Sequence, residues 1–217
     1  MQFATWEPIY LAILDDFGFS ASRDEEAAKL LEGLLNGKSL SLFEVARHVT
    51  GRRIVICGNA SCLAEDLNKL ANKELDQDRD LSRAFIVADG ATRVLLEKRI
   101  SPDIVVTDLD GPLDAICKAN SGGAVTVVHA HGDNLDAIRT FVPQLENVIG
   151  TVQCRPPNGL FNFGGFTDGD RCVFLAKELG AASIEFVGFD LNDESVTPRK
   201  KKKLAWAKKL TDLALKD

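Results

Sequence analysis

The amino-acid sequence predicts an α/β fold: a Rossmann-like, mostly parallel sheet with helices on both faces and an N-terminal helical extension. Three observations lead to this prediction. Six short runs rich in β-branched residues alternate with helical patterns from Arg52 onward. Their spacing is that of βαβ units, which build parallel sheets covered on both faces. Before that point, residues 1–50 carry helix signals and no strand pattern.

Residues 1–50 are expected to form the helical extension. The stretch "SASRDEEAAKLLEGLL" offers Ser20 or Ser22 as an N-cap, early acidic residues and an apolar stripe, and Gly37 is expected to end this helix. The stretch "SLSLFEVARHV" begins a second, short helix, in which His48 is interpreted as structural. The extension is therefore expected to pack on the rest of the chain and to carry no chemistry.

Residues 51–217 are expected to form one α/β domain. The predicted strands are "RIVIC", "AFIVA", "DIVVT", "AVTVVHA", "NVIGTVQ" and "SIEFVGF". Helical patterns stand between them, beginning with "CLAEDLNKLANK" and ending with "DRCVFLAKELG", and the basic segment "PRKKKKLAWAKKL" follows the last strand. In such folds the ligand lies beyond the carboxyl ends of the strands, so functional residues should stand in the loops after each strand.

The composition is that of an ordinary globular protein with an acidic balance. A net charge of −6 argues against general nucleic-acid binding, although the lysine-rich segment is locally basic. No apolar run is long enough to cross a bilayer, and the first residues carry no export signal. The five cysteines form no CxxC pair and their number is odd, which favours reduced thiols over a disulfide frame. These features predict a cytoplasmic protein without a membrane partner.

Aspartate residues stand in the loops after four of the predicted strands. They are Asp89, Asp108, Asp110, Asp133, Asp168 and Asp170. One aspartate per loop would serve as a helix N-cap, but the loops at 108–110 and 168–170 hold two each. Several carboxylates that converge on one rim repel one another and are stabilised by a cation. Carboxylate oxygens without a cysteine or histidine cage suit Mg²⁺, the usual companion of nucleotide phosphates.

Two further features suggest contact with phosphate. Gly58 to Ser61 form a glycine-containing turn between a strand and a helix, whose backbone N–H groups could meet a phosphate; a plain tight turn explains it equally well. Arg171 follows an acidic pair at the start of a helix, where its guanidinium could bind phosphate oxygens in a fork. The alternative for Arg171 is a surface ion pair with Asp168 or Asp170.

Three stretches resemble a known enzyme family. "FIVADGATRVLLEKRISPDIVVTDLDG", "HAHGDN" and "NFGGFTDGDRCVFLAKELGAASIEFVGFD" are similar to the archaeal-type 6-hydroxymethyl-7,8-dihydropterin pyrophosphokinases, and the likeness runs from about Arg52 to Lys209. The resemblance implies a catalytic domain at 51–217, similar in fold to thiamine pyrophosphokinases. It also implies Mg²⁺-dependent transfer of diphosphate from ATP to the hydroxymethyl group of a reduced pterin. The products would be AMP and a pterin diphosphate for folate-type or methanopterin-type cofactor synthesis.

The chain departs from the family pattern in the first loop. Where such proteins usually read Gly-x-Gly-Pro-Ser-Leu, it reads "GNASCL" from Gly58 to Leu63. The lost second glycine and proline weaken the case for a ligand at this loop, although Ser61 could replace the lost hydroxyl. Thiamine pyrophosphokinases are expected to carry an acidic pair followed by serine where this chain reads "DLDG", and their glycine-glycine-arginine–Asp-His signature is missing here. Thiamine is therefore the poorer substrate.

On this resemblance, the expected catalytic residues are Asp108, Asp110, Asp168 and Arg171. Asp108 and Asp110 are expected to bind Mg²⁺, with Asp168 or Asp170 completing the metal site. The residues expected to contact ATP or the pterin are Gly58, Asn59, Ser61, Asp89, Gly90, His131, Asp133, Asn162, Gly164, Gly165, Thr167, Asp170, Lys202 and Lys203. Asp133 or His131 could accept the hydroxyl proton. Asn162 or Phe163 could meet the flat pterin.

The expected partners are ATP and a reduced hydroxymethylpterin, with no nucleic acid and no membrane; a homodimer is left open. Besides a thiamine pyrophosphokinase-like enzyme, two alternatives come from other classes. A metal-dependent nucleotide-sugar glycosyltransferase would use Asp108 and Asp110 as an Asp-x-Asp element. A non-catalytic nucleotide-binding module would explain the altered loop at Gly58.

Overall fold

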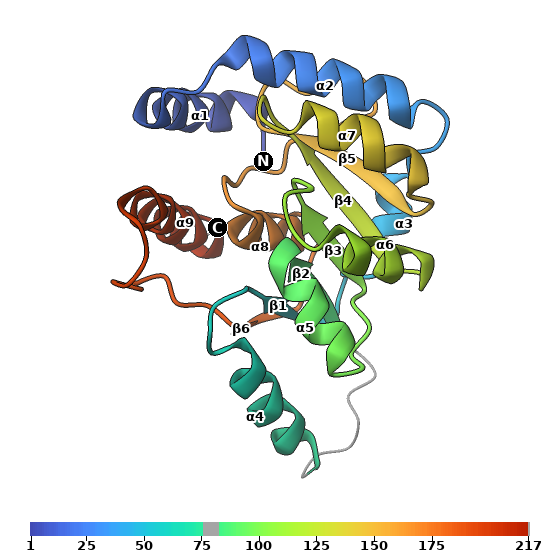
Figure 1. The fold of residues 1–217 in the computed structure, drawn as a ribbon, viewed down its shortest axis with the longest axis vertical. Coiled ribbons are helices and arrows are strands. Elements are labelled where there is room, and N and C mark those ends of the chain that lie inside the picture. The colour runs from blue at the N-terminus through green and yellow to red at the C-terminus, as the bar shows by residue number, and fades with distance from the viewer. Residues whose placement is uncertain (76–82, 217) are drawn as a thin grey trace.

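A computed structural model describes residues 1–75 and 83–216 (Figure 1). Six strands form one parallel sheet in the order β5-β4-β3-β2-β1-β6. The strands are β1 (Arg53–Cys57), β2 (Arg83–Ala88), β3 (Ile104–Thr107), β4 (Val125–Ala130), β5 (Val148–Val152) and β6 (Ser183–Val187). All six lie where the sequence predicts them, which confirms the α/β fold.

Helices cover both sides of the sheet. On one side lie α1 (Phe3–Phe17), α2 (Ala21–Leu35), α8 (Asp168–Glu178) and α9 (Pro198–Lys216). On the other lie α4 (Leu63–Leu75), α5 (Thr92–Glu97) and α6 (Leu113–Ser121). The shorter elements are α3 (Leu42–Ala46), α7 (Leu135–Phe141) and the 3₁₀ turns η1 (Asp89–Ala91) and η2 (Val142–Gln144).

The inner strands are buried, and β1 divides its apolar residues between two cores, whereas the edge strand β6 is only partly buried. In β1, Ile54 and Ile56 point into the large core that also holds Trp6, whereas Val55 and Cys57 point into a smaller core under α4 and α5. This alternation follows from the two-residue period of a strand. It explains why the strands read as continuous apolar runs in the sequence.

The N-terminal helices share the large core with the sheet. Trp6 and Ile13 of α1 and Leu31 of α2 are fully buried there. The indole N–H of Trp6 donates to the backbone oxygen of Gln153, just after β5, at 2.8 Å. The predicted boundary at residue 50 stays a prediction, but hydrogen bonds of Trp6 and Asp24 place α1 and the start of α2 beside the carboxyl ends of β5 and β4.

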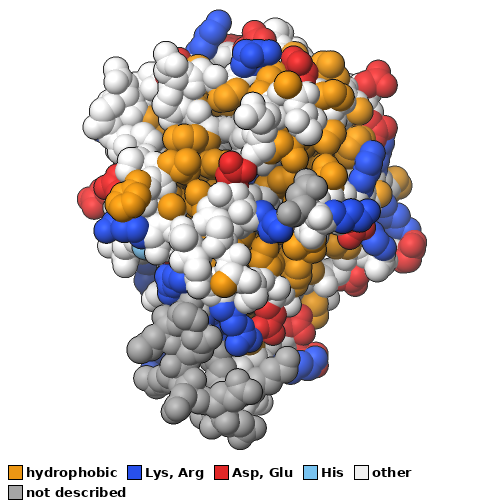
Figure 2. All heavy atoms as spheres, turned by 180° about the vertical axis from the view of Figure 1, so that it is seen from behind, with side chains coloured by type: hydrophobic (Ala, Val, Ile, Leu, Met, Phe, Trp, Pro, Cys, Tyr) orange, Lys and Arg blue, Asp and Glu red, His pale blue; other side chains and the backbone are white. Residues whose placement is uncertain are grey.

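The C-terminal helix closes against the N-terminal one. Figure 1 shows α9 beside α8, with α1 across from it. At the end of α1, Asp16 pairs with Lys202 at 2.6 Å and accepts a hydrogen bond from the Trp206 indole at 2.7 Å. Seen from behind, the surface mixes apolar side chains with acidic and basic ones (Figure 2). Within the described ranges, the helices are too short or too polar to cross a lipid bilayer.

Candidate active site

Three carboxylates from separate segments meet at the carboxyl edge of the sheet. Asp89 begins η1 after β2, Asp108 follows β3, and Asp168 is the first residue of α8. One oxygen from each lies within 4.8 Å of the other two. Since α8 packs over β1, β2 and β3, its N-terminus carries Asp168 to the ends of these strands. This is the convergence that the sequence predicts for residues after parallel strands.

Local structure around Asp89 fixes its carboxylate at this edge. The hydroxyl of Thr107 donates to Asp89 Oδ2 at 2.5 Å and accepts the N–H of Leu109 at 2.7 Å. A Cβ on Gly111 would stand 1.4 Å from Asp89 Oδ1, so only glycine leaves room for the carboxylate. Within the described residues, Asp89 Oδ1 is buried and has no hydrogen-bond partner. An oxygen in this state is suited to bind a group from outside the chain.

Burial and neighbouring groups shift the pKa values of the three carboxyl groups. Burial raises the pKa of Asp89 to about 6, and the charges of Asp108 and Asp110 add to the rise. Burial also raises the pKa of Asp168 well above its usual value, with further contributions from Asp108 and Asp89. For Asp108, burial is outweighed by His131 and Asp110, so its pKa falls to about 2. A cation among these oxygens would relieve the repulsion.

Asp110 and Asp170 differ from these three. Asp110 lies beside Asp108. Burial raises the pKa of Asp110, and the charge of Asp108 raises it further. The oxygens of Asp110 are not part of the three-carboxylate group. Asp170 caps α8 instead: its carboxylate accepts the N–H groups of Phe166 and Thr167, both at 2.7 Å. The sequence leaves Asp168 and Asp170 open for completing the metal site, and the geometry favours Asp168. It also adds Asp89 to the candidate metal ligands.

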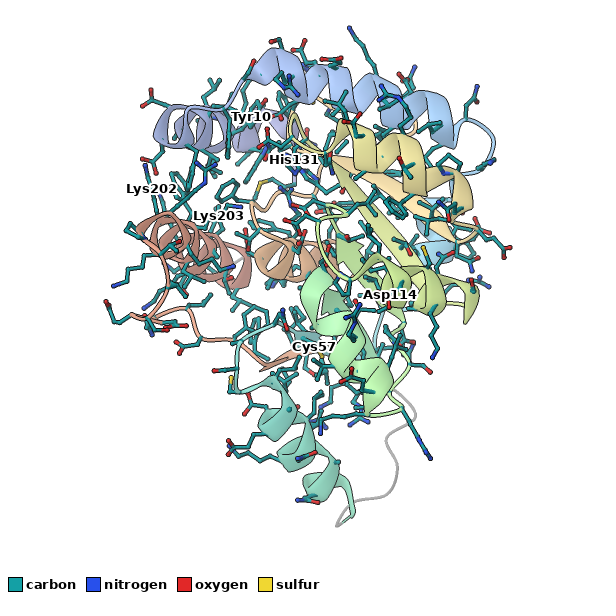
Figure 3. The ribbon with its side chains drawn as sticks, in the orientation of Figure 1. Tyr10, Cys57, Asp114, His131, Lys202 and Lys203 are labelled. Carbon is teal, nitrogen blue, oxygen red and sulfur yellow. The ribbon has the colours of Figure 1, made fainter. Side chains whose placement is uncertain are left out.

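A cavity of about 190 Å³ adjoins the three-carboxylate group. Its walls come from the corner between α1 and α2, the loop after β4, residues 153–171 and the start of α9. The residues that line it are Gly18, Phe19, Ser20, Arg23, Asp24, Asp108, His131, Gly132, Asp133, Gln153, Phe166, Arg171, Arg199 and Lys203. Figure 3 shows Tyr10, His131 and Lys203 directed toward this region from three different segments.

Arg171 and His131 are held in the wall of this cavity. Arg171 is only 8% exposed and donates to the backbone oxygen of Phe166 at 2.9 Å. The alternative of a surface ion pair for Arg171 is therefore wrong. The Nε2 of His131 lies 3.4 Å from Asp108 Oδ2, and its Nδ1 accepts the N–H of Asp133 at 3.3 Å. His129 is buried behind them, and burial, with the charge of Arg171, keeps its pKa well below the usual range.

The turn from Gly58 to Ser61 is occupied by contacts within the chain. The N–H groups of Gly58 and Ala60 donate to the backbone oxygens of Val187 and Gly188, each at 2.9 Å. A Cβ on Gly58 would also lie 2.6 Å from the oxygen of Gly188. Gly58 therefore serves packing against the end of β6, and its predicted role as a phosphate donor is not supported. Asn59 instead lies against Gly90, which places its amide near the start of η1.

The loop with Gly164 and Gly165 shapes the cavity from behind. Both glycines have a left-handed φ, 95° and 94°, and a Cβ on Gly165 would come within 2.8 Å of Arg171 Cα. Asn162 donates to the backbone oxygens of Gln153 and Cys154, at 3.0 and 3.1 Å. Phe163 is buried against Phe161, at 5.6 Å between ring centroids. The prediction that Asn162 or Phe163 meets the pterin finds no support, since Phe166 is the residue of this loop that lines the cavity.

The two predicted lysines of α9 have different surroundings. Lys203 lines the cavity. Burial and the charge of Asp108 raise the pKa of Asp110, and the charge of Lys203 partly opposes this rise. Lys202 is paired with Asp16 at 2.6 Å and lies 5.0 Å from the centroid of the Phe17 ring. Lys202 thus ties α9 to α1, whereas Lys203 faces the site.

Sequence reasoning missed the contribution of the N-terminal segment. It was expected to pack only, yet Phe19, Arg23 and Asp24 line the cavity next to His131 and Asp108. One signal was present: Asp24 lies three residues before Ala27, on the stripe of α2 that is otherwise apolar and buried. A carboxylate on the buried side of a helix needs partners, and it therefore indicates a built polar feature.

Comparison with known proteins identifies the family of the chain. A model of the family described as 6-hydroxymethylpterin diphosphokinase MptE-like matches residues 28–195. The "6-hydroxymethyl-7,8-dihydropterin pyrophosphokinase" of Methanothermobacter thermautotrophicus is 44% identical over 194 residues, which cover 89% of this chain and 80% of that protein. The protein of the same name from Methanocaldococcus jannaschii is 40% identical over 198 residues, with coverages of 88% and 80%. That from Pyrococcus furiosus is 41% identical over 193 residues, with coverages of 88% and 79%.

A solved structure supports the fold. The chain resembles the MAf glycosyltransferase from Magnetospirillum magneticum AMB-1 with a TM-score of 0.50 and 16% identity, covering 83% of this chain and 29% of that one. At this identity the likeness shows the fold alone. The family resemblance read from the sequence is confirmed by the relatives and by the match over residues 28–195. The chain belongs to the MptE-like 6-hydroxymethylpterin diphosphokinases, a family of diphosphotransferase enzymes.

Proposed function

We propose that the protein transfers diphosphate from ATP to the hydroxymethyl oxygen of 6-hydroxymethyl-7,8-dihydropterin, with Mg²⁺, and releases AMP. The observation that carries this proposal is the three-carboxylate group of Asp89, Asp108 and Asp168, placed beside a cavity with cationic walls. The names of the relatives point to the same reaction. The product would enter folate-type or methanopterin-type cofactor synthesis in the cytoplasm.

The residues present fit a magnesium ion. Three carboxylate oxygens within 4.8 Å of one another are hard donors, and Asp89 Oδ1 is buried without a partner among the described residues. Asp89, Asp108 and Asp168 would hold the ion, and Asp110 stands beside Asp108 to contact water or phosphate around it. When bound, Mg²⁺ supplies positive charge against the phosphate oxygens.

The cationic side chains of the cavity are assigned to the phosphates. Arg171, Arg199 and Lys203 line it from two helices, α8 and α9. Diphosphate transfer needs mainly positioning and charge stabilisation, because the attacking oxygen and the leaving AMP must lie in line with the transferred phosphorus. Arg171 suits this task best, since its hydrogen bond to Phe166 fixes the guanidinium before substrate arrives.

The structure favours Asp133 over His131 as acceptor of the hydroxyl proton. Both ring nitrogens of His131 already have neighbours, Asp108 at 3.4 Å and the N–H of Asp133 at 3.3 Å. His131 is therefore assigned to orienting Asp108. The Asp133 side chain is exposed at the rim of the cavity, where it can meet the hydroxyl group of an acceptor.

A direct test incubates the protein with Mg-ATP and one acceptor at a time: 6-hydroxymethyl-7,8-dihydropterin, its oxidised form, or thiamine. AMP is expected with the reduced pterin and not with thiamine. The variant Asp168→Asn should release no AMP, whereas Asp114→Asn, which changes an exposed side chain of α6 that pairs with Arg93 (Figure 3 labels Asp114), should match wild type. AMP formed with thiamine alone, or equally by Asp168→Asn, would contradict the proposal.

A further inference from the structure

The cavity continues beyond the residues that the proposed chemistry uses. From Asp108 and His131 it runs to the corner between α1 and α2, where Phe19 and Asp24 form its wall. Its volume of about 190 Å³ is below the roughly 300 Å³ at which pockets for drug-sized ligands begin. One bicyclic ring system fits the end of the cavity at this corner, which leaves the side with Arg171 and Lys203 for phosphate groups. This end of the cavity therefore suits the smaller of the two proposed substrates.

The walls at this corner are aromatic. Phe19 and Phe166 both line the cavity, with their ring centroids 6.4 Å apart, and Phe17 packs against them at 5.5 and 4.9 Å. Phe19 is half-buried, so part of its ring is open to a ligand. The guanidinium of Arg199 lies 5.6 Å from the centroid of Phe19 and borders the same space from α9. Adjoining ring faces of this kind bind flat heterocycles.

A buried carboxylate gives the corner its polar partner. Asp24 Oδ2 accepts hydrogen bonds from Tyr10 and Gln153, at 2.9 and 2.8 Å, and Asp24 Oδ1 accepts the N–H of Gly132 at 2.8 Å. A carboxylate oxygen can accept two hydrogen bonds, so Oδ1 retains one acceptor site while the other contacts hold the group rigid. Asp24 also lines the cavity. A heterocyclic substrate ring that carries N–H donors on its edge is complementary to this oxygen.

We propose that the corner formed by Phe19, Asp24 and Phe166 binds the heterocyclic ring of the acceptor substrate. The inference rests on the proposed function and adds where the acceptor lies. Phe19 and Phe166 contact the ring, Asp24 Oδ1 accepts an N–H from its amino-pyrimidinone edge, and the hydroxymethyl arm extends toward Asp108. The phosphates of ATP then approach from the side of the three-carboxylate group.

The test separates binding of the two substrates in the full-length protein. The dissociation constant of 6-hydroxymethyl-7,8-dihydropterin is measured by fluorescence without nucleotide, and that of Mg-ATP by calorimetry without pterin. Phe19→Ala should weaken pterin binding about tenfold and leave Mg-ATP binding unchanged, because a ring contact is lost. Phe19→Leu, which preserves packing against Phe17, should lose less. Phe43→Ala, on α3 and 76% exposed, is the matched control and should change neither constant.

The outcomes distinguish this inference from the proposed function. If both Phe19 variants bind pterin as wild type does while wild type releases AMP, the ring site is wrong and the reaction stands. Weaker Mg-ATP binding with unchanged pterin binding would place the adenine in this corner and overturn the inference. If Phe19→Ala loses pterin binding but wild type releases no AMP with any acceptor, the ring site stands and the proposed reaction fails.

Discussion

Asp24 and Asp89 are equally buried, each 3% exposed, yet their surroundings are opposite. Asp24 accepts three hydrogen bonds, from Tyr10, Gln153 and Gly132. Asp89 accepts one from Thr107, and its other oxygen is without a partner among the described residues. Three donors from separate segments fix the Asp24 carboxylate in place and leave a single acceptor site on its Oδ1, whereas Asp89 has a whole oxygen left for a group that the chain does not supply. The comparison separates a carboxylate that the chain holds from one that it leaves open at the same depth.

The largest expected effect follows from removing the charge of the incomplete carboxylate. Asp89→Asn should lower diphosphate transfer at least a hundredfold, because a metal ligand worth several kcal/mol in the transition state is lost. Its free energy of unfolding in metal-free buffer at neutral pH should stay equal to that of wild type or rise, since repulsion with Asp108 and Asp168 is relieved. AMP release and urea denaturation measure the two quantities, with Asp114→Asn as the control.

A variant that is both less stable and fully active would remove the distinction. In that case Asp89 would be held by the chain for stability, as Asp24 is, and the unpartnered oxygen would have another cause. If the loss of AMP release by Asp89→Asn matched the fraction of the variant that is unfolded under the assay conditions, the variant would act through the fold alone.

The carboxylate that three donors hold should show the opposite behaviour. Asp24→Asn replaces one acceptor oxygen by a donor that faces the N–H of Gly132 or the groups of Tyr10 and Gln153, so we expect it to lower the free energy of unfolding by about 3 kcal/mol. Tyr10→Phe removes one of the three donors and should cost about 1 kcal/mol. Denaturation of both variants, with Asp136→Asn on the exposed side of α7 as control, measures the difference. Asp24→Asn as stable as wild type would contradict the assignment.

The same comparison explains what the sequence could predict. Asp89 and Asp108 follow strands directly, and Asp168 begins the helix after the fifth strand, so the rule that ligands lie beyond strand ends was enough to bring them together. The partner of Asp89 lies at the same edge of the sheet, because Thr107 ends the neighbouring strand β3. Six parallel strands in the predicted places show how strongly apolar runs and spacing fix this part of the fold.

The corner beyond the three-carboxylate group could not be predicted in this way. Its wall combines Gln153, which follows β5, with Phe19 and Arg199, which lie outside the strand-end loops and far from it in the chain. The folding back of α1 and α9 depends on tertiary contacts such as Lys202 with Asp16, which spacing in the sequence does not encode. Likewise, the capping role of Asp170 and the chain-internal contacts of Gly58 depend on which backbone N–H groups are nearby, and that is a property of the fold.

An effect somewhat smaller than that of Asp24→Asn is expected from the pH dependence of stability that belongs to Asp89. Burial raises the pKa of Asp89 to about 6 from the 3.8 of an exposed group. Below the lower value both folded and unfolded states carry the proton. As the pH rises above this value, the unfolded state loses the proton first, while the folded state keeps it until about pH 6 because the carboxyl group is buried. Over this range wild type therefore loses stability relative to Asp89→Asn. In EDTA this difference should grow by about 2–3 kcal/mol between roughly pH 4 and pH 7.

Added Mg²⁺ should reverse this trend in wild type but not in Asp89→Asn, because the ion binds the ionised carboxylate and opposes its protonation. Denaturation curves of both proteins at several pH values, with EDTA or with Mg²⁺, measure the effect. For Asp108 the sign is opposite: its pKa is lowered to about 2, so its contribution is present above about 4 and is lost only in acid. A difference between wild type and Asp89→Asn that stays constant from acid to neutral pH would mean that Asp89 is not desolvated, and the contrast with Asp24 would fail.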